Sequence, residues 1–212
     1  LASGISLTSS GGTITLDATS GGVTSPGPLT ITAAGVLKLN DNLTASGPIA
    51  IKSNGLTIGG TALSSGTAST TILTSVAGTT IGLCRTVCAG SFGLGITSTD
   101  FAKISAGSLI IGDSTNGNIT VEGITTSIGD LTLNATNSSG RSITFNTGTS
   151  NFKGLAVNAS NGILLSSDVT TQGTTSFDSD TDAGTNIGGD FTLAANQLLS
   201  TTNNSLSITA ND

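Results

Sequence analysis

Short apolar triplets recur along the whole chain, and their spacing is the feature that most limits its fold. In each triplet two apolar residues flank a residue that is usually small or polar, as in Ile119-Thr120-Val121 and Leu131-Thr132-Leu133. Because successive side chains of a strand point to opposite faces, such a triplet predicts a half-buried β-strand. Glycine, asparagine, aspartate and serine separate the triplets, and these residues favour turns. No stretch has the spacing of an amphipathic helix, so the sequence predicts an all-β protein.

The triplets recur at a period of about 22 residues, as shown by Leu109, Leu131 and Leu155, which lie 22 and 24 positions apart. A weaker apolar position follows each pair of strong triplets. A repeat of this length with two strong strands and one weak strand is typical of a right-handed parallel β-helix, a solenoid whose coils stack on one another. The positions expected to form its inward core stripe are Leu109, Ile111, Ile119, Val121, Leu131, Leu133, Ile143, Phe145, Leu155, Val157, Ile163 and Leu165.

We expect residues 1–212 to form a single β-helix shaft segment that belongs to a longer protein. Two stretches depart from the repeat: a loop insertion is predicted near 84–91 and an acidic loop near 178–190, within a loop-like region, Thr174–Gly189. The chain carries only six basic residues and a net charge of −6, which argues against nucleic-acid binding. No apolar run approaches the roughly 20 residues of a transmembrane helix, so we expect no membrane insertion.

Three stretches carry a resemblance to a known family: Thr79–Leu83, Ser98–Asp113 and Gly117–Val121. They resemble the repeat region of filamentous-haemagglutinin-type exoproteins, which are long bacterial surface proteins with a right-handed parallel β-helix, exported through an outer-membrane partner by two-partner secretion. The Asn-Pro-Asn-Gly-Ile and Asn-Pro-Asn-Leu signatures of the family's secretion domain are absent from the sequence. The resemblance therefore implies a repeat shaft and not the secretion domain.

This resemblance implies the structural or adhesive shaft segment of a secreted or cell-surface adhesin associated with the outer membrane. Such a segment holds a binding region away from the cell and supports cell adhesion and biofilm formation. The implied partners are the outer-membrane secretion partner of the parent protein, glycans or receptors on host or neighbouring cells, and other rods through self-association.

The cysteines are Cys84 and Cys88. In an extended strand, positions four apart lie about 13 Å apart, whereas the Cα atoms of a disulfide lie within about 7 Å. A tight loop through residues 85–87 would bring the two together, and surface export implies an oxidising compartment. We predict a disulfide, with two free thiols as the alternative. A zinc site is disfavoured because no histidine or further cysteine is present to complete the ligand set.

Asp178, Asp180 and Asp182 occupy alternate positions before a glycine, as at the start of a calcium-binding loop. Gly189 stands where the loop's terminal glutamate is required. We expect a solvated acidic corner, with calcium as the alternative and no other cofactor. Six patterns match the glycosylation acceptor and leave modification open: Asn42, Asn118, Asn134, Asn137, Asn158 and Asn203.

Catalysis is not predicted from this sequence. Histidine, tryptophan and tyrosine are absent, and the six basic residues are dispersed along the chain. We therefore expect no enzyme and name no catalytic residue, with a carbohydrate-active β-helix enzyme as the weakest alternative. Threonine-rich triplets such as Thr13-Ile14-Thr15 leave an ice-binding β-helix as a second alternative, although Leu37-Lys38-Leu39 interrupts the regular threonine ranks that such a surface needs.

Overall fold

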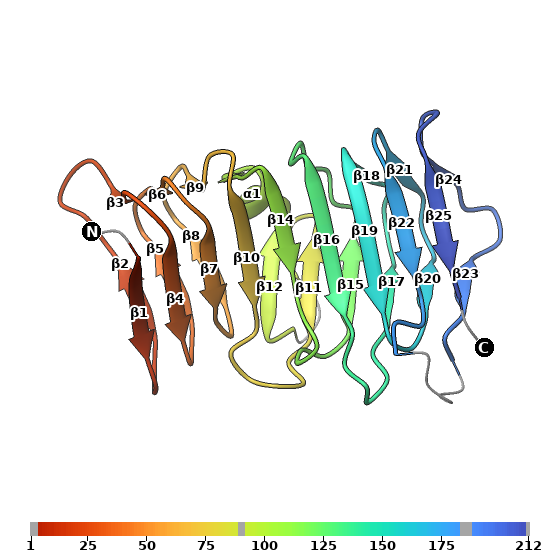
Figure 1. The fold of residues 1–212 in the computed structure, drawn as a ribbon, viewed down its shortest axis with the longest axis horizontal. Coiled ribbons are helices and arrows are strands. Elements are labelled where there is room, and N and C mark those ends of the chain that lie inside the picture. Colours follow the sequence, from red (N-terminus) through yellow and green to blue (C-terminus); the bar gives the residue numbers. More distant parts are fainter. Residues whose placement is uncertain (1–3, 89–91, 183–187, 211–212) are drawn as a thin grey trace.

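The computed structural model describes residues 4–88, 92–182 and 188–210, and these residues wind into a right-handed parallel β-helix (Figure 1). In Figure 1 one wall of strands runs downward at the front, and the chain returns behind it before advancing to the next coil, from β1 at the left to β25 at the right. Strands on each wall pair in parallel with their neighbours above and below. The predicted fold class is therefore confirmed.

The first wall is one continuous sheet of nine strands in the described part of the chain. Its strands, in spatial order, are β1 (Ile5–Ser9), β4 (Leu29–Ala33), β7 (Ile49–Lys52), β10 (Ser69–Leu73), β14 (Ser108–Ile111), β16 (Asp130–Ala135), β19 (Gly154–Ala159), β22 (Thr175–Asp178) and β25 (Leu206–Thr209). This spatial order is also the order of the strands along the chain.

The second wall consists of a three-stranded and a six-stranded sheet, and β8 of the first lies beside β12 of the second. The smaller sheet holds β2 (Ile14–Leu16), β5 (Leu37–Leu39) and β8 (Leu56–Ile58). The larger sheet holds β12 (Leu94–Thr97), β11 (Ile81–Cys84), β15 (Ile119–Glu122), β17 (Ile143–Phe145), β20 (Ile163–Leu165) and β23 (Phe191–Leu193).

The third wall is built from shorter strands, which agrees with its weaker apolar signal in the sequence. One sheet holds β3 (Val23–Ser25), β6 (Leu43–Ala45), β9 (Leu63–Ser64) and β13 (Ile104–Ser105). The other sheet holds β18 (Ser150–Phe152), β21 (Val169–Thr171) and β24 (Leu199–Ser200). Between the two sheets the chain makes a single bridge, from Thr125 to Asn151.

The repeat register places equivalent side chains on top of one another. Leu109 lies opposite Leu131, which lies opposite Leu155. All twelve positions of the expected core stripe are at most 3% exposed. Burying one such leucine or isoleucine contributes about 1.5–3 kcal/mol, so the stacked column supplies most of the favourable free energy of folding.

A coil buries its inward side chains only where another coil lies on each side of it. On the last described strands of the second and first walls, Leu193 is 43% exposed, and Leu206 and Ile208 are 44% and 45% exposed. Their equivalents one coil earlier in the stack are Leu165 and Phe177, both almost fully buried, and Thr175, which is buried as well. Stability therefore depends on contacts between coils, as in other solenoids.

The structure corrects the expected loop over Thr174–Gly189. Its first residues form β22, which pairs with β19 and β25 on the first wall. Phe177 is the inward residue of this strand and packs against Phe191, with the ring centres 5.1 Å apart. The prediction was wrong because Thr175 replaces the usual apolar residue at the start of the triplet. Residues 183–187 of the predicted acidic loop lie outside the described residues.

The fourth coil, residues 69–105, adds one strand to the second wall. Strand β11 precedes β12 in sequence, but β12 lies on the β8 side and β11 lies between β12 and β15. After β12 the chain enters the one-turn helix α1 (Ser98–Phe101), where Thr97 and Asp100 form a capping box, and it then rejoins the third wall at β13. Within the described residues, the second wall thus holds nine strands over the coils in which the first wall holds eight, β1 to β22.

Candidate functional site

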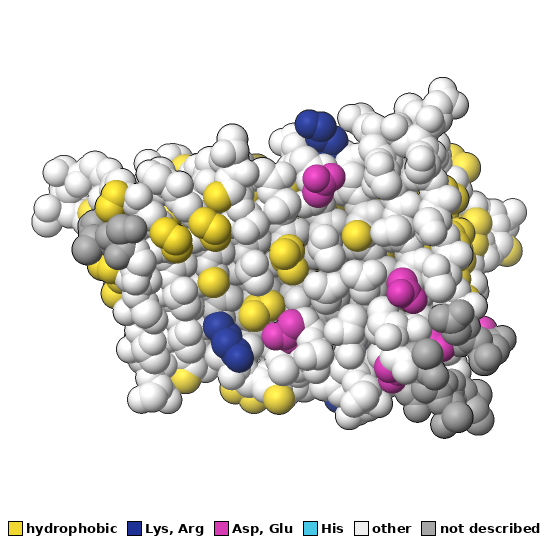
Figure 2. Space-filling view, viewed as in Figure 1, with side chains coloured by type: hydrophobic (Ala, Val, Ile, Leu, Met, Phe, Trp, Pro, Cys, Tyr) yellow, Lys and Arg dark blue, Asp and Glu magenta, His cyan; other side chains and the backbone are white. Residues whose placement is uncertain are grey.

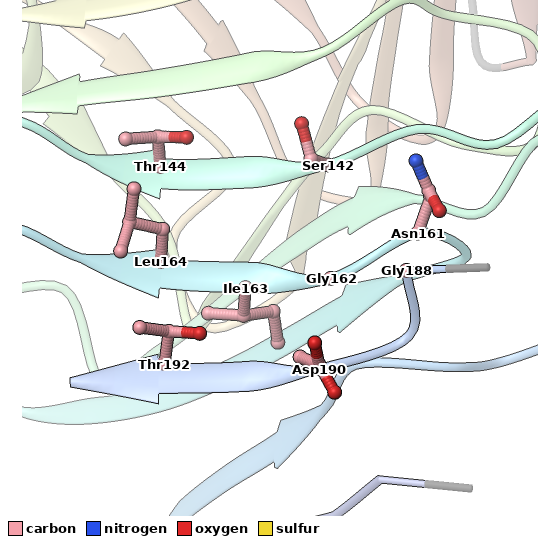
Figure 3. Close-up of a pocket in the computed structure, with 9 residues that line it drawn as sticks. All are labelled: Ser142, Thr144, Asn161, Gly162, Ile163, Leu164, Gly188, Asp190 and Thr192. Atoms are coloured by element: carbon pink, nitrogen blue, oxygen red, sulfur yellow. The ribbon is translucent and has the colours of Figure 1, made fainter. Parts of the chain in front are cut away.

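The outer surface of the second wall carries a hollow of about 290 Å³ beside the first residues of β17, β20 and β23. Figure 3 shows Thr144, Leu164 and Thr192 side by side on these neighbouring strands, with Ser142 and Asp190 near the strand starts. The full lining is Ser142, Thr144, Asn161, Gly162, Ile163, Leu164, Gly188, Asp190 and Thr192.

Gly162 creates this hollow because it leaves a gap between two polar residues. The strand register places it between Ser142 on one side and Asp190 on the other. Gly162 has a φ of +96°, and a Cβ there would lie 2.7 Å from the carbonyl oxygen of Gly188, so a larger residue would be strained as well as crowded. The backbone is fixed by hydrogen bonds from Gly162 N to Ser179 O and from Ile163 N to Asp190 O, both 2.9 Å.

The polar groups of the hollow are available for hydrogen bonds. Among the described residues, neither the side-chain amide of Asn161 nor the carboxylate of Asp190 has a hydrogen-bond partner. The hydroxyl groups of Ser142, Thr144 and Thr192 also line the hollow, and Leu164 is 36% exposed. This arrangement can accept and donate hydrogen bonds to a small polar group.

The disulfide loop forms a second distinctive surface. Cys84 and Cys88 are joined by a disulfide, with their Cα atoms 5.1 Å apart. The ring presents Arg85 and Thr86 to solvent, and Val87 is 75% exposed. A hollow of about 230 Å³ lies between this ring and the neighbouring coils, lined by Arg85, Thr86, Val87, Glu122, Thr147 and Gly148.

Cys88 and Phe92 lie against the outside of β11 and β12. A Cβ on Gly82 would lie 2.3 Å from the ring of Phe92, and one on Gly95 would lie 2.9 Å from Cys88 Sγ. Gly82 and Gly95 are register partners, so both strands have a glycine where the loop covers them. Residues 89–91 of the predicted insertion at 84–91 lie outside the described residues.

These glycines and Phe92 were not identified from the sequence. The available signal was the middle residue of two neighbouring triplets, Ile81-Gly82-Leu83 and Leu94-Gly95-Ile96, which is glycine where regular triplets carry threonine or another side chain. The hollow around Gly162 left no comparable signal, because its polar residues are common types that come from three different coils.

The predicted calcium ligands lie at the corner after β22. Asp178 is half-buried, Asp180 is buried, and the backbone N–H of Asp180 donates to Asp178 Oδ1 at 3.4 Å. Within residues 4–88, 92–182 and 188–210, no group of three or more acidic or cysteine side chains is placed to hold a metal ion. Calcium binding stays an untested alternative.

Several asparagines link neighbouring coils through their side chains. Asn158 Nδ2 donates to Asn134 Oδ1 at 2.8 Å, and these residues occupy equivalent positions on adjacent coils. Asn42 Oδ1 accepts hydrogen bonds from the backbone N–H groups of Thr61 and Ala62 at 2.8 and 3.0 Å. Asn118 Oδ1 also accepts a hydrogen bond from the backbone N–H of Ser142 at 3.2 Å. Four of the six glycosylation acceptor patterns therefore contain an asparagine that already links neighbouring coils.

No helix in the described part of the chain is long and apolar enough to cross a membrane. Comparisons of the chain with protein-family models, with curated proteins and with solved structures find no match. The resemblance to filamentous-haemagglutinin-type exoproteins thus depends on the residues quoted for it.

Proposed function

We propose that the chain is a shaft segment of a secreted or surface-displayed bacterial adhesin of the filamentous-haemagglutinin type. It holds a binding region away from the cell and so supports attachment to surfaces or to other cells. The observation that carries this proposal is the unbroken register of the first wall, whose nine strands keep one inward apolar column over the described part of the chain. Such a rod can hold a distant binding region at a fixed distance from the cell, because each coil is joined to the next by backbone hydrogen bonds.

The mechanism is mechanical presentation. Each coil adds one strand spacing of about 4.8 Å to the length of the rod. In the parent protein, the outer-membrane secretion partner would export the chain. The Cys84–Cys88 disulfide fits such an oxidising location.

The ice-binding alternative has less support from the outer surface of the first wall. Thr30 and Thr32 form one outward pair, but the equivalent positions on the next strands are Ala50 with Lys52 and then Thr71 with Leu73. A charged and a branched apolar side chain interrupt the rank that a flat ice-binding face requires. Thermal hysteresis measured on the purified chain would revive this alternative.

Removal of one whole coil from the surface-displayed parent protein tests the spacer role. Deleting Leu109–Asp130 joins Ser108 to Leu131, and the register continues because Leu131 occupies the position of Leu109. We expect attachment to be retained, since the rod loses only about 5 Å of length. The matched control replaces Asn161 and Asp190 with alanine, which removes the polar groups of the hollow and should also retain attachment. Loss of attachment by either variant, with export and the β-type circular dichroism intact, would show that the shaft itself contacts the receptor.

A further inference from the structure

The outer surface of the first wall is broad and carries few charges. The outward side chains on its strands are mostly serine, threonine, alanine, asparagine and glycine. On the described strands of this wall the outward charged residues are Lys52, Asp130 and Asp178. Figure 2 shows this face, where isolated charged groups lie among uncharged and small apolar side chains. The strands run nearly side by side with little twist across the wall (Figure 1).

The charges of opposite sign occupy related positions on this face. Lys52 lies on β7, the third of the nine strands, and Asp178 lies on β22, the eighth. The register carries the position of Lys52 through Leu73, Gly112 (the residue after β14), Asn134 and Asn158 to Asp178. Both charges therefore lie at the same height along their strands. The Lys52 ammonium has no hydrogen bond or ion pair with any residue that the structure describes.

We propose that this face binds the same face of a second copy of the chain, about a twofold axis that runs parallel to the strands between β14 and β16. This operation reverses the order of the strands and keeps the position along each strand. It places β7 of one copy over β22 of the other, and therefore Lys52 over Asp178, twice in each dimer. It also places β10 over β19 and β14 over β16.

The other outward residues fit this pairing. Ile110 on β14, next to the axis, faces Thr132 on β16 of the other copy, so the largest apolar group on these central strands lies at the middle of the interface. Asp130 is exposed at the start of β16 and faces the hydroxyl of Ser108 on β14 of the other copy. Ala156 on β19 faces Thr71 on β10, where small side chains allow the two sheets to approach closely.

The area is sufficient for a specific, concentration-dependent dimer. Eight facing strands spaced about 4.8 Å apart, each presenting about five residues, cover roughly 600 Å² per copy and about 1,200 Å² in total. This value lies at the low end for specific interfaces, so we expect a dissociation constant in the micromolar range, about 1–100 μM. The Lys52–Asp178 pairs select this register, because complementary charges contribute more to specificity than to affinity.

Charge reversal at Lys52 and Asp178 tests the proposal. Sedimentation equilibrium of the purified chain, from about 1 μM to about 1 mM, should show a monomer–dimer equilibrium that stops at two copies. Lys52→Glu and Asp178→Lys should each weaken the dimer by about tenfold or more, since each places two like-charged pairs in the interface. The double variant restores opposite charges and should recover wild-type affinity within about threefold.

Lys38→Glu is the matched control, because Lys38 is an outward lysine of β5 on the second wall and the variant has the same charge change. It should leave the dimer unchanged. Circular dichroism verifies that each variant is folded. A wild-type chain that stays monomeric, a double variant that stays weak, or a Lys38→Glu variant that weakens the dimer equally would overturn the proposal. Assembly beyond two copies would overturn it as well and would point to end-to-end contacts.

Discussion

The first three coils and the fourth coil bury the same kind of inward apolar residues with different arrangements of strands. In the first three coils, residues 5–64, each coil gives one strand to each wall, and spatial order follows chain order. The fourth coil, residues 69–105, gives two strands to the second wall, and the later strand, β12, lies before the earlier one, β11. The repeat pattern therefore determines which side chains face inward, but it leaves the order of equivalent strands open.

The two strands of the fourth coil are nearly interchangeable by sequence. Ile81 and Leu83 point inward from β11, as Leu94 and Ile96 do from β12, and all four are fully buried. Either order would bury the same apolar residues. In the regular coils, exposed side chains such as Thr57 cover the outside of the wall, whereas Gly82 and Gly95 leave room for Phe92 and Cys88. In the fourth coil, the connections between strands and not the core residues therefore determine the strand order.

The largest expected effect comes from a deletion that removes only part of a coil. Deleting Leu109–Gly117 joins Ser108 to Asn118, the residue before β15, so a second-wall strand would have to occupy the first wall. We expect aggregation or loss of a cooperative thermal transition, because inward leucine and isoleucine side chains become exposed and strands unpaired. The control deletion, Leu109–Asp130, removes a whole coil and should melt cooperatively in circular dichroism. Equally severe unfolding of both variants would contradict the 22-residue register.

Removing the extra strand should convert the fourth coil into a regular one. Leu94 N donates to Thr80 O at 3.1 Å, so deleting Ile81–Gly93 joins two chain segments that are already adjacent. The chain should remain a folded β-helix, because Leu94 can take the register position of Ile81 beside Ile119. The lost burial of Ile81 and Leu83 should lower the free energy of unfolding by about 3–6 kcal/mol. Denaturant titration measures this loss, and failure to fold would show that β11 is required.

Breaking the disulfide should have a smaller and more local effect. Replacing Cys84 and Cys88 with serine opens a ring of five residues, and the expected loss is about 2 kcal/mol. Hydrogen exchange should accelerate in β11 and β12, while the amides of β4 and β5 in the regular coils stay protected. Uniform acceleration in all coils would mean that the loop stabilises the whole stack, contrary to the nearest-neighbour behaviour of a solenoid.

Filling the space under the loop should have the smallest effect. Gly82→Val places side-chain atoms against the Phe92 ring, and the exposed loop can partly move away, so we expect a loss of about 1 kcal/mol. The matched variant Thr57→Val changes the outward residue of β8, which nothing covers, and should be close to neutral. Thermal melting compares the two. Equal melting temperatures would show that the loop does not pack on Gly82.

Several features of the molecule were predictable because they depend on short-range patterns. The alternation of apolar and polar residues predicted the core stripe, and the 22-residue period predicted the stacking of Leu109 on Leu131. Strand β22 was missed because Thr175 weakens its triplet. The hollow around Gly162 was missed because Ser142, Gly162 and Asp190 are neighbours only through the pairing of three strands.

By itself, the sequence determined the coil length, the inward column and the all-β character of this protein, because each follows from side-chain alternation within a few residues. Only the tertiary structure decided the order of β11 and β12. The connection before β11 begins beside the third coil, where Ser75 N donates to Ser53 O at 3.3 Å, and ends beside the fifth, where Gly78 N donates to Thr115 O at 2.8 Å. These hydrogen bonds take the chain past one strand position of the second wall. Strand β11 therefore forms next to β15, and the chain then returns to form β12 in the position that was passed. Their partners are 22 and 37 residues away, so no local pattern in the sequence could indicate them.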